Sequence, residues 1–307
     1  VFTSLFGNEA IKSYLSRALQ EERLPQTLLF EGMEGVGKSL FARELAGYLL
    51  TGSGAFEQHP DFHVLRPEGK SGLHAIDELR KCIDQVYEAP FLSERKVFVI
   101  HDAERMQAPS ANALLKTLEE PPLDTTIILL TSQAREILPT ILSRCIQLHF
   151  HPLPSECIAD ILKAQGHSAH FASLAHGSAS KALLLATDSS FSEIQKIILK
   201  LLSKPVFYPD LADELERIEL LLEPIKEESP VAYHRRVDML FATLLMWARD
   251  QVLLSVGGGT SFFPEEMKVS SPPSLPAFEQ VVQEARIAFQ RNMKLSVCLQ
   301  QCFLRNG

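Results

Sequence analysis

The first half of the chain alternates short apolar runs with longer segments whose apolar residues recur every three or four positions. Runs of four or five apolar residues are typical of strands buried in a parallel sheet, and the wider spacing is typical of amphipathic helices. The predicted strands are residues 27–30, 62–65, 97–100, 126–130 and 146–150. The predicted helices are residues 2–23, after a short entry turn, and residues 40–50, 76–86, 111–120 and 138–144. This alternation predicts an α/β fold whose parallel sheet is covered on both faces and binds its ligand at the carboxyl ends of the strands.

The second half has helical spacing only. Predicted helices cover residues 191–202, 211–222, 231–254 and 278–289, with Pro205, Pro224 and Pro230 between them. A polar turn is expected at residues 68–72. Gly257-Gly258-Gly259 and the stretch from Ser270 to Pro273 bracket an irregular connection.

Composition narrows the class of protein. With 307 residues and 46% hydrophobic content, the chain can bury more than one core, so two or three domains are expected. The net charge of −8 argues against strong autonomous binding to nucleic acid. Five cysteines without a C-x-x-C pair suit a reducing cytosol, and no apolar run approaches a membrane span. Because residues 1–12 also lack the pattern of a secretion signal, a cytoplasmic protein without a membrane partner is expected.

Gly32 to Ser39 reads Gly-Met-Glu-Gly-Val-Gly-Lys-Ser and fills all fixed positions of the phosphate-loop pattern between a predicted strand and a predicted helix. Glycines let backbone N–H groups turn towards phosphate oxygens, and the helix N-terminus adds partial positive charge. Lys38 is expected to reach the terminal phosphates of ATP or ADP, and the Ser39 hydroxyl to bind magnesium. The alternative is a glycine-rich turn that only starts a helix. The candidate nucleotide-binding residues of this loop are Gly32, Glu34, Gly35, Val36, Gly37, Lys38 and Ser39.

The strand at residues 97–100 is followed by His101 and Asp102. In phosphate-loop enzymes the residue directly after this strand is normally the aspartate that supports the metal, and here it is His101. Asp102 stands where a glutamate usually polarises the attacking water, and it is about one methylene shorter. Alternatively, Asp102 and Glu104 only cap the next helix. Asp102 and Ser132, which follows another predicted strand, are further candidate nucleotide-binding residues.

Two stretches carry a family resemblance. The sequence from Asn112 to Pro122, reading Asn-Ala-Leu-Leu-Lys-Thr-Leu-Glu-Glu-Pro-Pro, and Leu142-Ser143-Arg144-Cys145 resemble the AAA+ subunits of the bacterial sliding-clamp loader. The resemblance covers the whole chain but is strong only from residue 2 to 150. It implies that Arg144 is a trans-acting arginine finger for the ATP site of a neighbouring subunit. The alternative for Arg144 is a helix-end arginine that binds carbonyl groups.

The same resemblance implies a domain plan: a nucleotide-binding AAA+ core at residues 1–151, a helical lid at 152–189 and an all-α collar at 190–307. Members that hydrolyse ATP carry an acidic pair where this chain has His101 and Asp102, and a lid arginine where it has Ser180. Lys181 is adjacent, but a helical step of about 100° turns it away. The four-cysteine zinc insertion of the family is also missing, so no zinc is expected.

On this basis the chain is expected to bind nucleotide without hydrolysing it, and independent enzyme activity is uncertain. The implied partners are the other subunits of a hetero-oligomeric ring, the sliding clamp, and primer-template DNA only as part of the complex. An ATP-hydrolysing loader motor of the gamma or tau type is the first alternative. A phosphate-loop kinase for a small substrate is a weaker one. His59 and His63 have a spacing that suits a metal on a helix, but Pro60 and the strand pattern oppose this.

Overall fold

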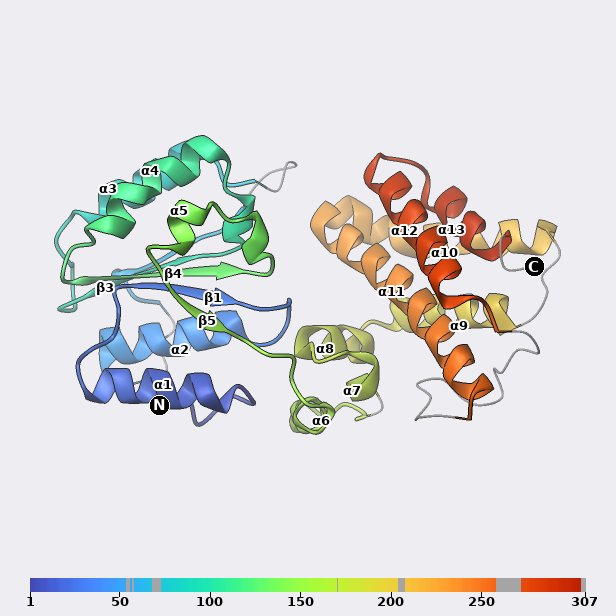
Figure 1. Ribbon diagram of the computed structural model, residues 1–307, viewed down its shortest axis with the longest axis horizontal. Coiled ribbons are helices and arrows are strands. Elements are labelled where there is room, and N and C mark those ends of the chain that lie inside the picture. The colour runs from blue at the N-terminus through green and yellow to red at the C-terminus, as the bar shows by residue number, and fades with distance from the viewer. Residues whose placement is uncertain are drawn as a thin grey trace. The chain divides into compact units, whose positions relative to one another are not determined.

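The computed structural model describes residues 1–53, 56, 58–67, 73–169, 171–203, 208–257 and 272–304 (Figure 1). The chain forms two compact units, Val1–Leu184 and Leu185–Gly307. The division predicted within the first unit, at residue 151, stays a prediction. The turn expected at residues 68–72, Pro205 and most of the irregular connection after Gly257 lie outside the described residues.

The first unit contains one parallel sheet of five strands in the order β2-β3-β4-β1-β5. All five predicted strands are confirmed, and each observed boundary lies within one residue of the predicted one. The strands are β1 (Thr27–Glu31), β2 (Phe62–Leu65), β3 (Lys96–Ile100), β4 (Thr125–Thr131) and β5 (Ile146–His149).

Helices cover both faces of this sheet (Figure 1). The helices α1 (Glu9–Gln20) and α2 (Lys38–Thr51) lie on one face, and α3 (Ile76–Val86), α4 (Ala108–Glu119) and α5 (Pro139–Leu142) lie on the other. Successive strand residues point to opposite faces. Leu28 and Phe30 therefore pack with α1 and α2, whereas Leu29 packs with α3 and α4.

Two helices are shorter than the sequence predicts. The helix expected within residues 2–23, after a short entry turn, begins only at Glu9. Asn8 before it has a positive φ of 53°, and Phe2 is fully buried outside the helix. The Phe2 ring stacks on Phe41 at 5.5 Å between centroids. The helix expected at residues 138–144 ends at Leu142, so Arg144 lies outside a helix.

The first unit continues into the short helices α6 (Ser155–Ala164), α7 (Phe171–Leu174) and α8 (Ala179–Thr187). Leu153, just before α6, donates its N–H to the Gly177 carbonyl, just before α8, at 2.9 Å. The segment is called the lid below.

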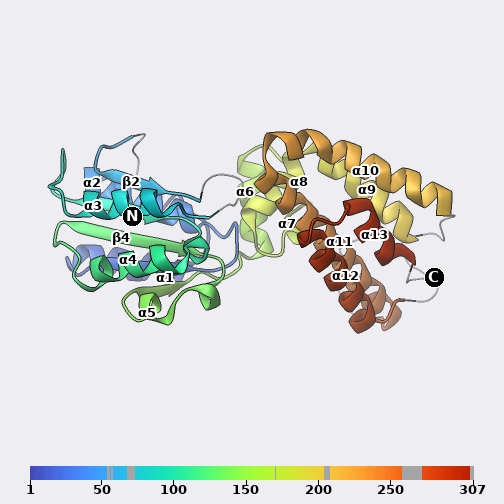
Figure 2. The same cartoon turned by 90° about the horizontal axis from the view of Figure 1, so that it is seen from above.

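The second unit is built from helices only, as far as the structure describes it (Figure 2). They are α9 (Ser189–Ser203), α10 (Tyr208–Glu228), α11 (Pro230–Ser255), α12 (Leu275–Gln290) and α13 (Leu295–Leu304). Pro230 starts α11 as predicted, but Pro224 lies inside α10 and does not end it. Because Pro224 has no N–H, the carbonyl of Leu220, four residues earlier, loses its hydrogen-bond donor within the helix. Leu220 is 69% exposed, so water can donate to this carbonyl instead. The helix α13 lies beyond the last predicted helix, at residues 278–289, and contains Cys298 and Cys302, whose spacing suits helix packing.

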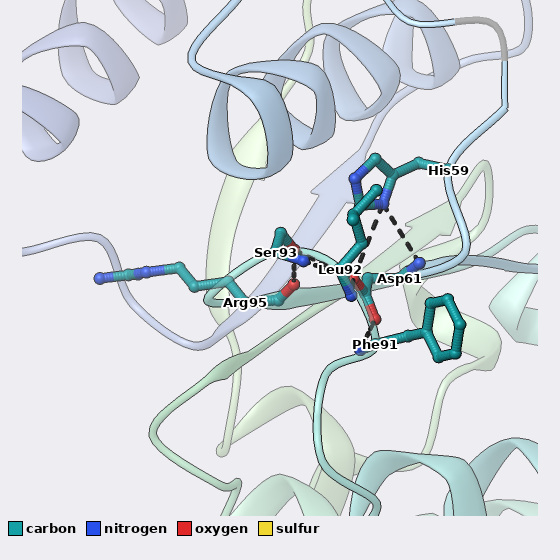
Figure 3. Close-up of polar contacts among 6 residues, drawn as sticks. All are labelled: His59, Asp61, Phe91, Leu92, Ser93 and Arg95. Carbon is teal, nitrogen blue, oxygen red and sulfur yellow. Dashed lines mark hydrogen bonds and ion pairs between the residues drawn. The ribbon is translucent and has the colours of Figure 1, made fainter.

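Two buried charges organise the edge of the sheet where the strands begin. Asp61 accepts hydrogen bonds from the backbone N–H groups of Phe91 at 2.5 Å and of Leu92 and Ser93 at 2.8 Å (Figure 3). Burial alone would raise the pKa of Asp61, but these N–H donors lower it to about 2. Lys96, buried in β3, donates to the Val86 carbonyl at 2.6 Å and so caps the C-terminus of α3.

No helix among the described residues is long and apolar enough to cross a membrane.

Candidate functional site

The phosphate loop, residues 32–39, runs from the end of β1 into the first turn of α2 and needs glycine at three positions. Gly32, Gly35 and Gly37 have φ angles of 154°, 82° and 101°, in the region that favours glycine. A Cβ atom at Gly32 would lie 2.4 Å from the Phe150 carbonyl oxygen. Val36 is 1% exposed and anchors the loop in the core. The loop therefore has a fixed backbone, with Gly37 as the N-cap of α2.

Lys38 lies folded over this loop. Its Nζ donates to the carbonyl oxygens of Gly32 at 2.5 Å and Met33 at 2.9 Å. Burial lowers the pKa of Lys38, and the charges of Glu104, Glu34 and Asp102 oppose that shift. Ser39 is exposed in the first turn of α2, where no side chain caps the helix N-terminus. Glycine backbone, ammonium, hydroxyl and helix N-terminus together suit the phosphates of a nucleotide.

The lid touches the phosphate loop directly at Gly35. Ala179 N–H, at the start of α8, donates to the Gly35 carbonyl at 2.8 Å. A Cβ atom at Gly35 would lie 2.1 Å from Ser178 Oγ and 3.0 Å from Ser180 Cβ. Ser180, which takes the position of the lid arginine in the resemblance, is thus beside the loop, but its side chain carries no charge. Burial lowers the pKa of Lys181, its neighbour.

His101 and Asp102 follow β3 at the same edge of the sheet as the phosphate loop. Ile100 and Leu29 both pair with Leu129, so His101 is level with Phe30, close to the start of the loop. Burial lowers the pKa of His101 to about 4, and the nearby charges of Arg66, His74 and Lys38 lower it further in the same direction. The imidazole is therefore neutral at physiological pH. Asp102 is exposed and has a positive φ of 47°.

Glu104 forms a hydrogen-bonded group with the end of β4. Its carboxylate accepts from Thr131 Oγ1 at 2.7 Å and from Ser132 Oγ at 2.7 Å. Burial acts to raise the pKa of Glu104, but these hydroxyls outweigh it and the pKa is lowered. Neither Asp102 nor Gln107, the N-cap residues of the next two helical segments, makes a side-chain cap. The capping alternative for Asp102 and Glu104 is therefore wrong, and the role of Glu104 was missed because its partners are 27 and 28 residues away.

Arg144 lies at the opposite edge of the sheet. The register Leu28↔Ile146 puts it level with Gln26, and Thr27 Oγ1 donates to its carbonyl oxygen at 2.7 Å. The side chain is 31% exposed and donates from Nε to Glu119 Oε1 at 2.8 Å and from a terminal nitrogen to the Thr140 carbonyl at 2.8 Å. An open depression lies beside it, lined by Gln26, Thr27, Leu118, Glu119, Pro121, Ser143 and Arg144.

The structure thus brings most of the candidate residues together and keeps one apart. The phosphate loop, His101, Asp102, Glu104 and Ser132 share the carboxyl edge of the sheet. Arg144 is level with Gln26, which lies six residues before Gly32. At about 3.3 Å per residue along a strand, this separates Arg144 from Gly32 by ~20 Å. An arginine side chain is much shorter than this, so Arg144 cannot reach the phosphate loop of its own chain.

The residues at the carboxyl edge fit a nucleotide better than they fit magnesium. Mg²⁺ prefers oxygen ligands, and the position that normally supplies a carboxylate holds the neutral imidazole of His101. The Glu104 carboxylate is already used by Thr131 and Ser132. Among the residues described, no three His, Cys, Asp or Glu side chains group closely enough to hold a metal ion. Of the two positions that normally support magnesium, the loop hydroxyl and the residue after β3, only the first, Ser39, holds an oxygen ligand.

Comparison with known proteins agrees with this architecture. Residues 7–154 match the family described as DNA polymerase III, delta subunit. The chain is 32% identical to DNA polymerase III subunit delta' of Bacillus subtilis over 208 residues, which are 62% of this chain and 63% of that protein. It is 33% identical to subunit tau/gamma of Haemophilus influenzae over 174 residues, 52% of this chain and 25% of that protein. The chain thus spans less than two thirds of these relatives.

A crystal structure of a DNA polymerase III gamma subunit-related protein from Thermotoga maritima has a TM-score of 0.51 and 20% identity, covering 95% of this chain and 98% of that one. At this identity the likeness shows the fold alone. The five-stranded parallel sheet with a phosphate loop at its carboxyl edge has the AAA+ type of fold. The chain is similar to the clamp-loader subunits of DNA polymerase III, and to the delta-prime subunits in particular.

Proposed function

We propose that this chain is a clamp-loader subunit that supplies Arg144 to the ATP site of a neighbouring subunit and does not hydrolyse ATP itself. It joins other loader subunits in a hetero-oligomeric ring that places a sliding clamp on primed DNA. The clamp and the DNA meet this chain only within that complex.

One observation carries the proposal: Arg144 lies on the edge of the sheet opposite to the phosphate loop of its own chain. The guanidinium there binds Glu119 and the Thr140 carbonyl of its own chain, and its exposed part is open to a second molecule. In phosphoryl transfer, an arginine from a neighbour neutralises the charge that develops on the transferred phosphoryl group. The planar, always charged guanidinium suits this role better than a lysine.

The lack of hydrolysis rests on two residues beside the phosphate loop. His101 takes the place of the metal-supporting carboxylate, and Ser180 takes the place of the lid arginine. Without them, metal placement and charge stabilisation in the transition state are both weak. The loop itself is intact, so ATP or ADP binds as a structural ligand.

The alternative is an active motor of the gamma or tau type, favoured by the matching tau/gamma relative. Calorimetric titration and phosphate release by the purified full chain, with and without primed DNA, separate the two. The proposal predicts ATP binding, loss of binding in Lys38→Ala, and no turnover above background. Steady phosphate release by the wild-type chain that disappears in Lys38→Ala would establish the motor instead, and absence of ATP binding would remove the structural-ligand role.

A further inference from the structure

We propose that nucleotide binds this chain with an affinity that does not depend on magnesium, and that His101 is the residue that sets this independence. The inference rests on the nucleotide binding proposed above. It concerns which form of the ligand the site takes: the bare polyphosphate is bound as well as its magnesium complex.

The first step is the place of His101. Because Ile100 and Leu29 both pair with Leu129, His101 sits two strands from the β1 residue just before the phosphate loop. Neighbouring strands are about 4.8 Å apart, so the two strand ends are separated by roughly 10 Å. A side chain at this position faces a magnesium ion held by Ser39 and the terminal phosphates in phosphate-loop enzymes.

The second step is that His101 is fixed where it is. Its backbone N–H donates to the Leu65 carbonyl at 2.9 Å, and its carbonyl oxygen accepts from His74 Nε2 at 2.7 Å. The next residue, Asp102, has already left the extended conformation, with φ 47°. A one-residue slip that would bring Asp102 into the place of His101 would break both hydrogen bonds.

The third step concerns the groups that remain to bind the nucleotide. A neutral imidazole is a poor ligand for Mg²⁺ and a poor acceptor for its bound waters, compared with a carboxylate. Glu104 is held by two hydroxyl groups of β4 and its continuation. The groups left for the phosphates are Lys38, the loop N–H groups and the N-terminus of α2. All of these attract the phosphate oxygens themselves and need no metal.

The test is calorimetric titration of the full chain with ATP and with ADP, once in excess Mg²⁺ and once in EDTA. The wild type is expected to bind with Kd values that differ by less than about threefold between the two conditions. His101→Asp restores the missing carboxylate, and it is expected to bind tenfold or more tightly in Mg²⁺ than in EDTA, the size of outer-shell effects at metal sites. His101→Asn, of similar size to the aspartate but neutral, should keep the wild-type behaviour.

Asp102→Asn, in the wild-type background, tests whether the neighbouring carboxylate supports a metal ion. The Kd values of this variant in Mg²⁺ and in EDTA are expected to differ by less than about threefold, as for the wild type. Wild-type binding that is lost in EDTA would overturn the inference while leaving the proposed nucleotide binding intact. A loss of affinity in Mg²⁺ on Asp102→Asn would also overturn it, because Asp102 would then be the metal-supporting acid. Failure to bind in either condition would remove the nucleotide binding together with the inference.

Discussion

Arg144 Nε donates to Glu119 Oε1 at 2.8 Å, a contact between the last residue of α4 and a residue 25 positions later in the chain. The Thr140 carbonyl accepts a second hydrogen bond from the same guanidinium at 2.8 Å. Glu119 is 47% exposed. An ion pair this exposed is worth at most about 1 kcal/mol, so a neighbour's phosphate can replace the carboxylate at small cost.

Glu119→Gln is therefore expected to change little. The variant loses an exposed ion pair but keeps Arg144, so loader assembly and ATPase should stay within about twofold of wild type. Both are measured in a reconstituted loader beside Arg144→Ala. If the two substitutions impair the loader equally, the importance of Arg144 lies in its pairing with Glu119 and not in a contact with phosphate.

Gly35→Ala is expected to destabilise the chain more than Gly52→Ala. Both glycines have positive φ angles, 82° and 72°, which cost an alanine roughly 1–2 kcal/mol. Only at Gly35 does the new Cβ also meet another side chain, Ser178 Oγ at 2.1 Å, whereas nothing lies within 4 Å at Gly52. Thermal unfolding of the two variants measures the difference. Equal melting temperatures would show that the lid does not rest on the phosphate loop in solution.

Asp61→Asn is expected to loosen the segment at residues 91–93. The amide offers one acceptor oxygen in place of two, and hydrogen bonds to a charged group contribute about 1.5–3 kcal/mol. Phe91 and Leu92 are 84% and 70% exposed, so chymotrypsin should cut the variant faster there. Asp77→Asn, at a side chain 82% exposed, is the matched control. Unchanged cleavage in Asp61→Asn would contradict the assigned role.

The contribution of Asp61 to the free energy of unfolding also depends on pH. Its pKa is depressed from 3.8 to about 2 in the folded chain, so its carboxylate stabilises the fold fully above the unfolded value. That contribution is lost as the pH falls from about 4 towards 2. The difference in the free energy of unfolding between wild type and Asp61→Asn should therefore shrink over this range. A difference that persists at the acid end would mean that the ionised form is not what matters.

Binding of the isolated chain to duplex DNA is expected to be weak. A chain with a net charge of −8 can make few contacts to DNA phosphates. Even proteins that make many such contacts bind non-specific DNA with Kd values of about 1–100 μM at physiological salt. Fluorescence anisotropy with a primed duplex measures this. Submicromolar binding by the chain alone would contradict the expectation that DNA is met only by the whole complex.

The strands and the phosphate loop were predictable because their signals are local. Four or five consecutive apolar residues, as in β3, are typical of a strand in a sheet covered on both faces. The glycine positions of the loop likewise follow from backbone geometry within a few residues. Pro224 shows the limit of such reasoning, because its effect depends on whether water can reach the carbonyl that loses a partner.

The side-chain partners were not predictable from local pattern. Asp61 binds backbone groups about 30 residues away, and Glu104 binds the end of a strand 27 residues away. Lys96 directly precedes the strand predicted at residues 97–100, yet it is buried and caps α3. In each case the tertiary fold supplies the partner. The position of Arg144 relative to the phosphate loop likewise needs the strand register, which the sequence does not state.

The most direct test of the central claim is ATP hydrolysis by a loader reconstituted with Arg144→Ala, with Arg80→Ala as the control at another exposed arginine. An arginine finger contributes about 10³–10⁵ in rate at the site that it serves. Because the other sites keep their own fingers, steady-state ATPase should fall partly and clamp loading more strongly, with ring assembly intact and Arg80→Ala unaffected. Wild-type ATPase and clamp loading by a correctly assembled Arg144→Ala ring would contradict the account.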